Sequence, residues 1–209
     1  MIASDLAIIF LMIEKLSHKI KQLLSLSSRK DIFRILPKNS ICAELGVFKG
    51  DFSKQILKYT YPKEVHFIDI WWKEFGEYYP DWGEYTNYGK LKTQDAYNDT
   101  LKKINNYTNS FIYVGNDVEY LKTFSDRYFD WVYVDSSHAY DHTKDELEVL
   151  NNKIKENGII CGHDWHNDET HIHYGVTKAV VEFCDSYDWK LIYVDKHMQW
   201  AIKKATNFL

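Results

Sequence analysis

The sequence predicts an α/β domain with helices on both faces of a mostly parallel, seven-stranded sheet that ends in an antiparallel hairpin. Short apolar runs alternate with segments of helical periodicity, which is the pattern of βαβ units with parallel strands. The last two apolar runs, 190–194 and 199–202, are joined by so short a link that they should pair antiparallel. A length of 209 residues suits one sizeable domain better than two.

The stretch from Phe129 to Trp165 shows the βαβ pattern most clearly. Its two apolar runs, 131–134 and 159–161, each lead to a carboxylate, and apolar residues recur at helical spacing between them. Ligands of such sheets bind in the crevice beyond the carboxyl ends of the strands. We therefore expect four side chains to meet in this crevice: Asp135, His138, His163 and Asp164.

The other elements follow from the same two patterns. Strands are predicted over 41–46, 65–70 and 111–114, and helices over 31–36, 51–59, 90–104, 118–124 and 176–185. Asp117 stands where the N-cap of the helix over 118–124 is expected. The inward face of the helix over 90–104 is predicted to include Leu101.

Residues 1–38 are predicted to be a helical extension packed on the main domain, residues 39–209. Apolar residues recur at helical spacing over 4–27, with lysines on the opposite face. A helix on the domain's edge is the first interpretation, and a homodimer contact or a membrane-surface helix are the alternatives. The apolar residues 6–13 lack a basic flank and a cleavage site and are too few to span a bilayer.

The composition limits which binding partners and which cellular compartment we expect for the protein. The net charge is −4 and the basic pairs Arg29-Lys30 and Lys203-Lys204 are isolated, so nucleic acid is not an expected partner. The three cysteines are scattered without a CxxC spacing, as expected of reduced thiols. A soluble protein of the cytoplasm, without a transmembrane segment, is the prediction.

The first glycine turn has a nucleotide-binding pattern. Glu44, Gly46 and Gly50 follow an apolar strand and precede a helix, and the next strand leads to Asp69 about 20 residues later. Glycine at these positions lets the backbone approach a ligand closely.

The order of these elements resembles that of the class I S-adenosylmethionine-dependent methyltransferases, over residues 40 to 204. More closely, the chain resembles a branch that includes small-molecule and sugar O-methyltransferases. The matching segments are AELGVFKGDFSKQI, HFIDIW, YVGNDVEYL, FDWVYVDSSHAYDHTKDELE, GIICGHDW and YGVTKAVVEF. The resemblance implies S-adenosylmethionine as the cofactor and a small hydroxylated acceptor, such as a sugar or sugar nucleotide.

The resemblance also implies roles for the residues of the first half. Glu44 would lie under the amino acid tail of the cofactor, Ile70 and Trp71 would flank the adenine, and Asn116 with Asp117 would meet its edge. Asp69 can accept hydrogen bonds from both ribose hydroxyls. Val47 and Phe48 in the first turn argue against a dinucleotide, because a pyrophosphate needs a more open backbone.

Methylation of a hydroxyl also requires removal of its proton, and two arrangements are available. In the first, Asp135 and Asp164 bind a divalent metal ion with His163 or water. Similar sugar O-methyltransferases carry magnesium there, often on an Asp-Asp pair, whereas imidazole suits a transition metal better. In the second, His138 or His163 is a general base. A third interpretation leaves the acids structural, with Asp135 as a ligand to the cofactor's amino group or a helix cap.

Two loops remain open in their roles. Residues 71–88 carry eight aromatic side chains without a regular period and are expected to form a lid or acceptor wall, or else a packed loop. Residues 163–173 are rich in histidines and acids, which predicts a polar loop over the acceptor site or a transition-metal site. The rival functions are an N- or phosphate-directed methyltransferase, a non-catalytic nucleoside-binding protein and, less favoured, a nicotinamide dehydrogenase.

Overall fold

A computed structural model describes residues 28–205. The predicted helix over 4–27, with its dimer or membrane alternatives, lies outside the described residues. The elements, in chain order, are η1 (Arg29–Arg34), β1 (Ile41–Leu45), α2 (Asp51–Thr60), β2 (Glu64–Asp69), α3 (Trp72–Phe75), η2 (Gly83–Thr86), α4 (Thr93–Ile104), β3 (Ser110–Val114), α5 (Asp117–Thr123), β4 (Phe129–Val134), α6 (Tyr140–Lys153), β5 (Ile154–Gly162), α7 (Tyr174–Tyr187), β6 (Trp189–Val194) and β7 (Trp200–Lys204).

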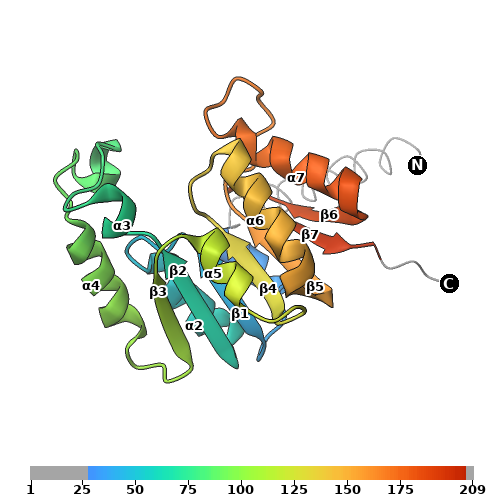
Figure 1. Ribbon diagram of the computed structural model, residues 1–209, viewed down its shortest axis with the longest axis horizontal. Helices are drawn as coiled ribbons and strands as arrows, with labels where there is room; N and C mark the ends of the chain where they lie inside the picture. The colour runs from blue at the N-terminus through green and yellow to red at the C-terminus, as the bar shows by residue number, and fades with distance from the viewer. Residues whose placement is uncertain (1–27, 206–209) are drawn as a thin grey trace, which may run out of the picture.

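The strands form one sheet in the order β3-β2-β1-β4-β5-β7-β6 (Figure 1). The five strands from β3 to β5 in this order are parallel, whereas β7 runs antiparallel to both β5 and β6. The chain reverses its direction of travel across the sheet between β3 and β4, which makes the carboxyl ends of β1 and β4 a topological switch point. The predicted fold class, including the C-terminal hairpin, is confirmed.

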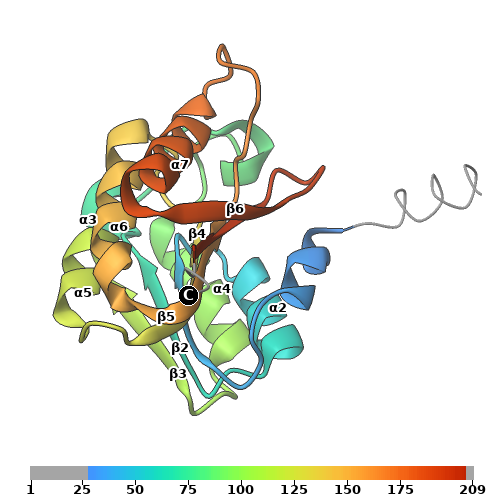
Figure 2. The ribbon, with the colours of Figure 1, turned by 90° about the vertical axis from the view of Figure 1, so that its right-hand side faces the viewer.

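Helices cover both faces of the sheet (Figure 2). The segments η1, α2 and α4 lie on one face, and α5, α6 and α7 lie on the other. Each face has its own cluster of buried apolar residues, around Phe67 and Tyr133 on the first and around Val132 and Leu147 on the second. The side chains of neighbouring strand residues such as Val132 and Tyr133 thus pack on opposite faces of the sheet, as the two-residue period of a strand requires.

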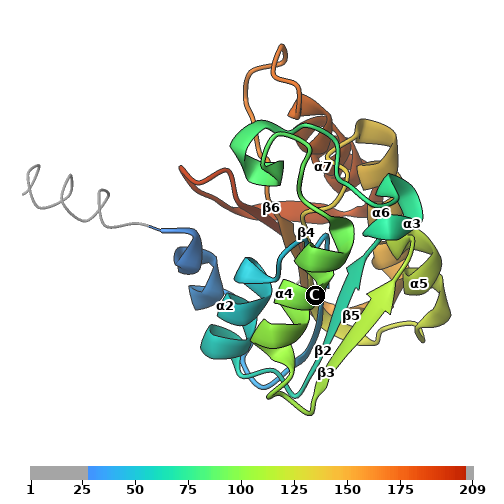
Figure 3. The ribbon, with the colours of Figure 1, turned by 90° about the vertical axis from the view of Figure 1, so that its left-hand side faces the viewer.

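The aromatic segment after β2 is folded rather than extended. It contains the short helices α3 and η2, and it runs from the end of β2 to α4, which lies beside α2 (Figure 3). Phe75, Tyr79 and Trp82 pack on one another with ring centroids 5.2–5.4 Å apart. Several rings nevertheless remain exposed, so the segment both packs and presents an aromatic surface.

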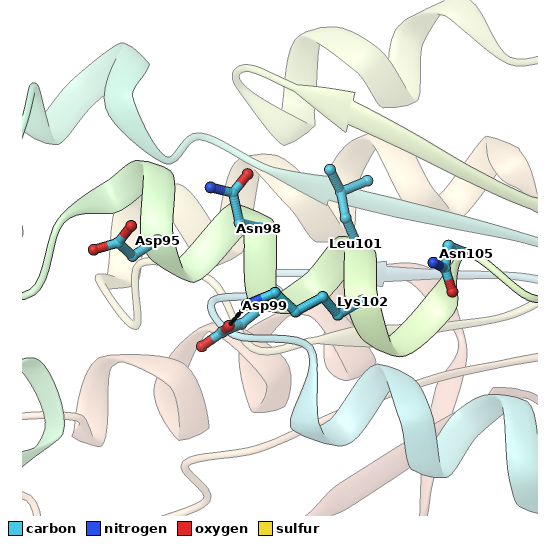
Figure 4. Close-up of a pocket in the computed structure, with 6 residues that line it drawn as sticks. All are labelled: Asp95, Asn98, Asp99, Leu101, Lys102 and Asn105. Carbon is cyan, nitrogen blue, oxygen red and sulfur yellow. Dashed lines mark hydrogen bonds and ion pairs between the residues drawn. The ribbon is translucent and has the colours of Figure 1, made fainter.

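Two predictions about helices are wrong. Asn116, not Asp117, is the N-cap of α5, since its side chain accepts the N–H of Glu119 at 3.0 Å. Leu101 does not face inward: it is 37% exposed and lines a shallow depression on the outer side of α4 (Figure 4). The buried side chains of α4 are Thr93, Ala96, Thr100 and Ile104, because two threonines take inward positions where an apolar residue is normally expected.

Over residues 28–205, no helix is long and apolar enough to cross a membrane.

Candidate active site

The turn after β1 brings the chain very close to the end of β4. Gly46 has φ 81°, and a Cβ on it would lie 2.0 Å from the carbonyl oxygen of Asp135. Only glycine permits both the left-handed backbone and this approach. Gly50, with φ 73°, is the N-cap of α2, where a Cβ would lie 3.0 Å from Cα of Thr100. Both glycines of the predicted pattern are therefore needed to form the turn.

Asp69 holds this glycine turn against the end of β2. Its Oδ2 accepts the backbone N–H groups of Val47 and Phe48, each at 2.7 Å, and its Oδ1 accepts that of Trp71 at 2.9 Å. Burial raises the pKa of Asp69, and these backbone donors oppose that shift. The side chain is only partly enclosed, and Oδ1, which accepts one of these three N–H groups, keeps room for a further donor.

Trp71 follows Asp69 and is fully buried. Its indole N–H donates to the carbonyl of Phe48 at 2.9 Å, and its ring packs edge-on against Tyr97. The ring presents no exposed face in this conformation. Trp71 could contact an adenine only if its hydrogen bond to Phe48 broke. Ile70 beside it is half-buried, so part of its side chain is accessible to a ligand without such a change.

Glu44 lies under the glycine turn, at 1% exposure. Burial raises the pKa of this carboxyl well above its ordinary value, and Ser53 in the first turn of α2 hydrogen-bonds it at 2.5 Å. Glu44 thus ties β1 to α2.

Asp117 begins α5 and pairs with α6. Its Oδ1 lies 2.9 Å from Nε2 of His142, and the fully buried Glu146 lies 3.7 Å from the same nitrogen. The hydrogen bond to Asp117 raises the pKa of His142. Glu146 in turn accepts the hydroxyl of Ser136 at 2.6 Å, which connects Asp117 to the loop after β4. His142 therefore belongs to a buried network of acids.

The ends of β4 and β5 carry a cluster of two acids and two histidines, which we call the four-residue ring: Asp135, His138, His163 and Asp164. His138 Nε2 lies 3.2 Å from Asp135 Oδ1 and 3.1 Å from Asp164 Oδ2. His163 Nδ1 lies 3.0 Å from Asp164 Oδ2 and 3.8 Å from Asp135 Oδ1. The structure thus brings together the four side chains that the strand-end argument placed here.

Backbone geometry at the ring is unusual for residues with a Cβ. His138 has φ 58° and Asp164 has φ 62°, both in the left-handed region. Such conformations cost about 1–3 kcal/mol and persist where surrounding contacts fix them, which is common at functional sites.

The outer oxygens of the two acids have further partners. Asp164 Oδ1 lies 3.0 Å from His173 Nδ1 and 3.6 Å from His166 Nε2. Asp135 Oδ2 accepts Nη2 of Arg29 at 2.9 Å. His173, the N-cap of α7, belongs to the segment 163–173 that was predicted to lie over the acceptor site or to bind a metal, whereas Arg29, the first residue of η1, was not expected at the site.

The ring is strongly polarised. Burial disfavours the ionised form of both acids, but the histidines, together with Arg29 beside Asp135, hold the pKa of each carboxyl below its usual value. Burial likewise disfavours the charged form of His138, yet its hydrogen bond and the charges of Asp135 and Asp164 raise its pKa. These charges favour two carboxylates and a protonated His138 in the free protein.

The donor atoms of the ring suit a divalent ion. Asp135, His163 and Asp164 each offer one ligand atom, and these atoms lie within 4.8 Å of one another. His138, Asp164 and His173 form a second such group. A set of imidazole and carboxylate donors matches zinc or another transition metal better than magnesium, which prefers oxygen alone.

The glycine turn and its surrounding acids suit a nucleoside with an amino acid tail. Gly46 and Gly50 give close backbone approach, Asp69 stands at the end of β2, and Asn116 lies at the end of β3. Arg29 Nε is buried and has no hydrogen-bond partner among residues 28–205, as expected of a donor kept for a ligand. These residues fit S-adenosylmethionine.

Solved structures share this fold at low sequence identity. A putative rRNA methylase from Clostridium thermocellum matches with a TM-score of 0.57 and 13% identity, over 84% of this chain and 95% of that one. SMU.1697c, a putative methyltransferase from Streptococcus mutans solved with S-adenosylhomocysteine, matches with a TM-score of 0.57 and 12% identity over the same shares. The fibrillarin pre-rRNA processing protein of Methanococcus jannaschii matches with a TM-score of 0.54 and 15% identity, over 80% of this chain and 67% of that one.

The sequence itself matches no curated protein. A family model described as "Methyltransferase domain" does match, over residues 43–165. That range is more than half of the chain and includes the glycine turn, Asp69, Asn116 and the four-residue ring. The chain therefore belongs to this methyltransferase domain family and has the fold of the class I S-adenosylmethionine-dependent methyltransferases.

Proposed function

We propose that the protein transfers the methyl group of S-adenosylmethionine to a hydroxyl of a small acceptor, such as a sugar or sugar nucleotide. The observation that carries this proposal is the position of the four-residue ring. Asp135 touches the glycine turn through its backbone, so the ring lies beside the turn where the cofactor's tail is expected. When bound, S-adenosylmethionine supplies an electrophilic methyl group, and the protein must align it with the acceptor oxygen.

In this proposal the first half of the chain holds the cofactor. Glu44, Gly46 and Gly50 surround the amino acid tail, and Asp69 accepts from the ribose hydroxyls through Oδ1, since Oδ2 already accepts two backbone N–H groups. The adenine lies near Ile70 and Trp71, with Asn116 and Asp117 at its edge. Asp135 stands at the junction of the cofactor's tail and the ring.

The ring then deals with the proton of the acceptor hydroxyl. His138 in the free protein lies between two carboxylates that raise its pKa and favour its protonated form, which cannot accept a proton. This supports the metal arrangement over a His138 base: Asp135, His163 and Asp164 would hold a divalent ion, which would make the acceptor hydroxyl more acidic. His163 as the base is the alternative.

The aromatic segment supports a small acceptor. Tyr85 stacks on Phe48 of the glycine turn with ring centroids 4.7 Å apart. The negative charges of Asp135 and Asp164 act on its hydroxyl group. Tyr85 is 63% exposed, so a flat amphipathic surface with a hydroxyl faces solvent near the ring. Such a wall suits a sugar ring, which has both apolar faces and hydroxyls.

A nucleic-acid acceptor is the less favoured possibility. One of the similar solved structures is described as a putative rRNA methylase, but this chain has a net charge of −4. Phosphate-tracking proteins need a basic surface. The proposed compartment is the cytoplasm, because Cys42, Cys161 and Cys184 are all free thiols.

An acceptor panel tests the proposal. Sugars, sugar nucleotides, amines and phosphorylated metabolites would each be incubated with the protein and S-adenosylmethionine, and mass spectrometry would find a gain of one methyl group. We expect O-methylation of a hydroxylated acceptor. Methylation only of a nitrogen or phosphate oxygen would replace the proposal by its rival, and failure to bind S-adenosylhomocysteine in calorimetry would remove both.

Metal removal tests the ring separately. Zinc, manganese and magnesium would be titrated calorimetrically into metal-free wild type and Asp164→Asn. We expect a transition metal to bind wild type at least tenfold more tightly than magnesium, and the variant to lose this preference. Full methyl transfer in the presence of a chelator would exclude the metal arrangement and leave His163 as the candidate base.

A further inference from the structure

Arg29 reaches the candidate active site from outside the region that the family model matches. It lies in η1, before the first strand, and its guanidinium stands 4.9 Å from the ring centroid of Phe52 in the first turn of α2. Its Nη2 donates to Asp135 Oδ2 at 2.9 Å and to the hydroxyl of Tyr133 at 3.1 Å. The guanidinium thus lies between α2 and the end of β4, on the flank of the glycine turn.

The position of Arg29 is fixed by the C-terminal hairpin. Gln199, fully buried just before β7, donates from Nε2 to the carbonyl of Arg29 at 3.0 Å. Its Oε1 accepts the hydroxyl of Tyr133 at 3.1 Å, which is the same hydroxyl that Arg29 contacts. Backbone and side chain of Arg29 are therefore both anchored, which is more than an isolated surface ion pair requires.

The guanidinium has hydrogen-bonding capacity left over. It carries five N–H donors, and both protein acceptors among residues 28–205 bind Nη2. Nε is buried without a partner in the same range, while the side chain as a whole is 36% exposed. A buried unsatisfied donor costs about 1–3 kcal/mol, so a bound carboxylate that accepted from Nε would recover that cost.

The charge pattern matches an amino acid zwitterion. A carboxylate, Asp135, and a guanidinium, Arg29, stand side by side, and the charges of both act on the buried Glu44. An ammonium group would be attracted to the first and a carboxylate to the second. The tail of S-adenosylmethionine carries both groups on one carbon.

We propose that Arg29 binds the carboxylate of the cofactor's amino acid tail, opposite Asp135, which binds the ammonium group. This inference rests on the proposed function, since it assigns a new residue to the same cofactor. It makes η1 part of the cofactor site and explains why a buried glutamine from the C-terminal hairpin supports a residue of the N-terminal segment.

Two ligands that differ in the tail test this assignment. S-Adenosylhomocysteine contains the amino acid carboxylate, whereas 5′-methylthioadenosine lacks the amino acid. Calorimetry on the full chain would give both dissociation constants for wild type, Arg29→Gln and Arg29→Lys. We expect Arg29→Gln to weaken S-adenosylhomocysteine about 10- to 100-fold, as for loss of a charged hydrogen bond. Binding of 5′-methylthioadenosine should change less than about twofold, and Arg29→Lys should bind S-adenosylhomocysteine with intermediate affinity.

Arg34→Gln is the matched control. Arg34 lies in the same helix, its side chain is 82% exposed, and its ion pair is the local one with Asp31, so both ligands should bind the variant as they bind wild type. An equal loss of both ligands in Arg29→Gln would overturn the assignment, because it would indicate a structural role. Unchanged binding of S-adenosylhomocysteine would overturn it too, and would leave Arg29 for an anionic acceptor. If wild type did not bind S-adenosylhomocysteine at all, the proposed function itself would fail.

Discussion

The two halves of the sheet's carboxyl edge hold their acids in different ways. On the β1–β2 side, Asp69 is held by backbone N–H groups and Glu44 by a serine hydroxyl. On the β4–β5 side, Asp135 and Asp164 are surrounded by histidines and an arginine. Burial dominates the first pair and raises the pKa of both carboxyls, whereas charged partners lower the pKa of the second pair.

This difference suggests a division of labour. Backbone donors cannot titrate or leave, so the β1–β2 side is a rigid frame for a ligand that keeps the same shape. Histidines can exchange a proton or bind a metal ion, so the β4–β5 side can change its charge during a reaction. Substitutions on each of the two sides test this division.

Asp164→Asn should damage the reaction far more than cofactor binding. The substitution removes the charge that His138, His163 and His173 share, and with it either a metal ligand or the orientation of the base. We expect methyl transfer to fall about 10²- to 10⁴-fold, while the dissociation constant of S-adenosylhomocysteine changes less than about threefold. Steady-state kinetics and calorimetry on one preparation would check both values. Equal losses in the two would break the proposed division.

Asp69→Ala should damage cofactor binding and the fold together. Three backbone N–H groups lose their acceptor, and each costs about 1–3 kcal/mol where it becomes unsatisfied and buried. We expect a clear decrease in the free energy of unfolding in urea, and S-adenosylhomocysteine binding at least 100-fold weaker. Asp69→Asn is the control, since its amide oxygen keeps one acceptor. Wild-type affinity in Asp69→Ala would refute the ribose assignment.

The Asp117–His142 pair joins the start of α5 to α6, and it should give the stability of the protein a modest pH dependence. Asp117, with Glu146, Asp145 and Glu74 nearby, raises the pKa of His142 above 6.5, so its stabilisation is complete below that value. It is lost as the pH rises through the raised pKa of the folded protein. The pKa of Asp117 is lowered, so its contribution is lost only in acid.

We therefore expect the free energy of unfolding of wild type to exceed that of His142→Gln by more at about pH 6 than at about pH 8.5. Urea denaturation of both proteins at the two values would measure it. His171→Gln, a change in the exposed loop before α7, should leave the pH dependence close to that of wild type. The same difference at both values would show that His142 is not held by its charge.

The order of strands and helices was predictable because the strands and the helices of each βαβ unit differ in the spacing of their apolar residues. Strand-end residues could also be placed together, since parallel strands end at one edge of the sheet. Leu101 shows the limit of this reasoning: helical spacing marks a face, but threonines at positions 93 and 100 took the inward one. Asn116 rather than Asp117 caps α5, because a one-residue shift of a helix start is beyond what two neighbouring capping residues can specify.

The contacts made by loops were not predictable. Arg29 belongs to an isolated basic pair with no motif around it, and only the folded chain brings it to Asp135, 106 residues away. His173 contacts Asp164 across a loop whose sequence has no regular hydrophobic period. Trp71 points inward because its indole N–H donates a hydrogen bond to the Phe48 carbonyl. These contacts depend on how the loops fold back onto the sheet, and the spacing of residues along the sequence does not predict that.

A crystal structure of the full chain with S-adenosylhomocysteine would test the division of labour most directly. We predict ribose hydroxyls hydrogen-bonded to Asp69, the tail carboxylate on Arg29, and the sulfur directed toward the gap between Asp135 and Asp164. A ribose that makes no contact with Asp69, or a sulfur directed away from the four-residue ring, would contradict the account.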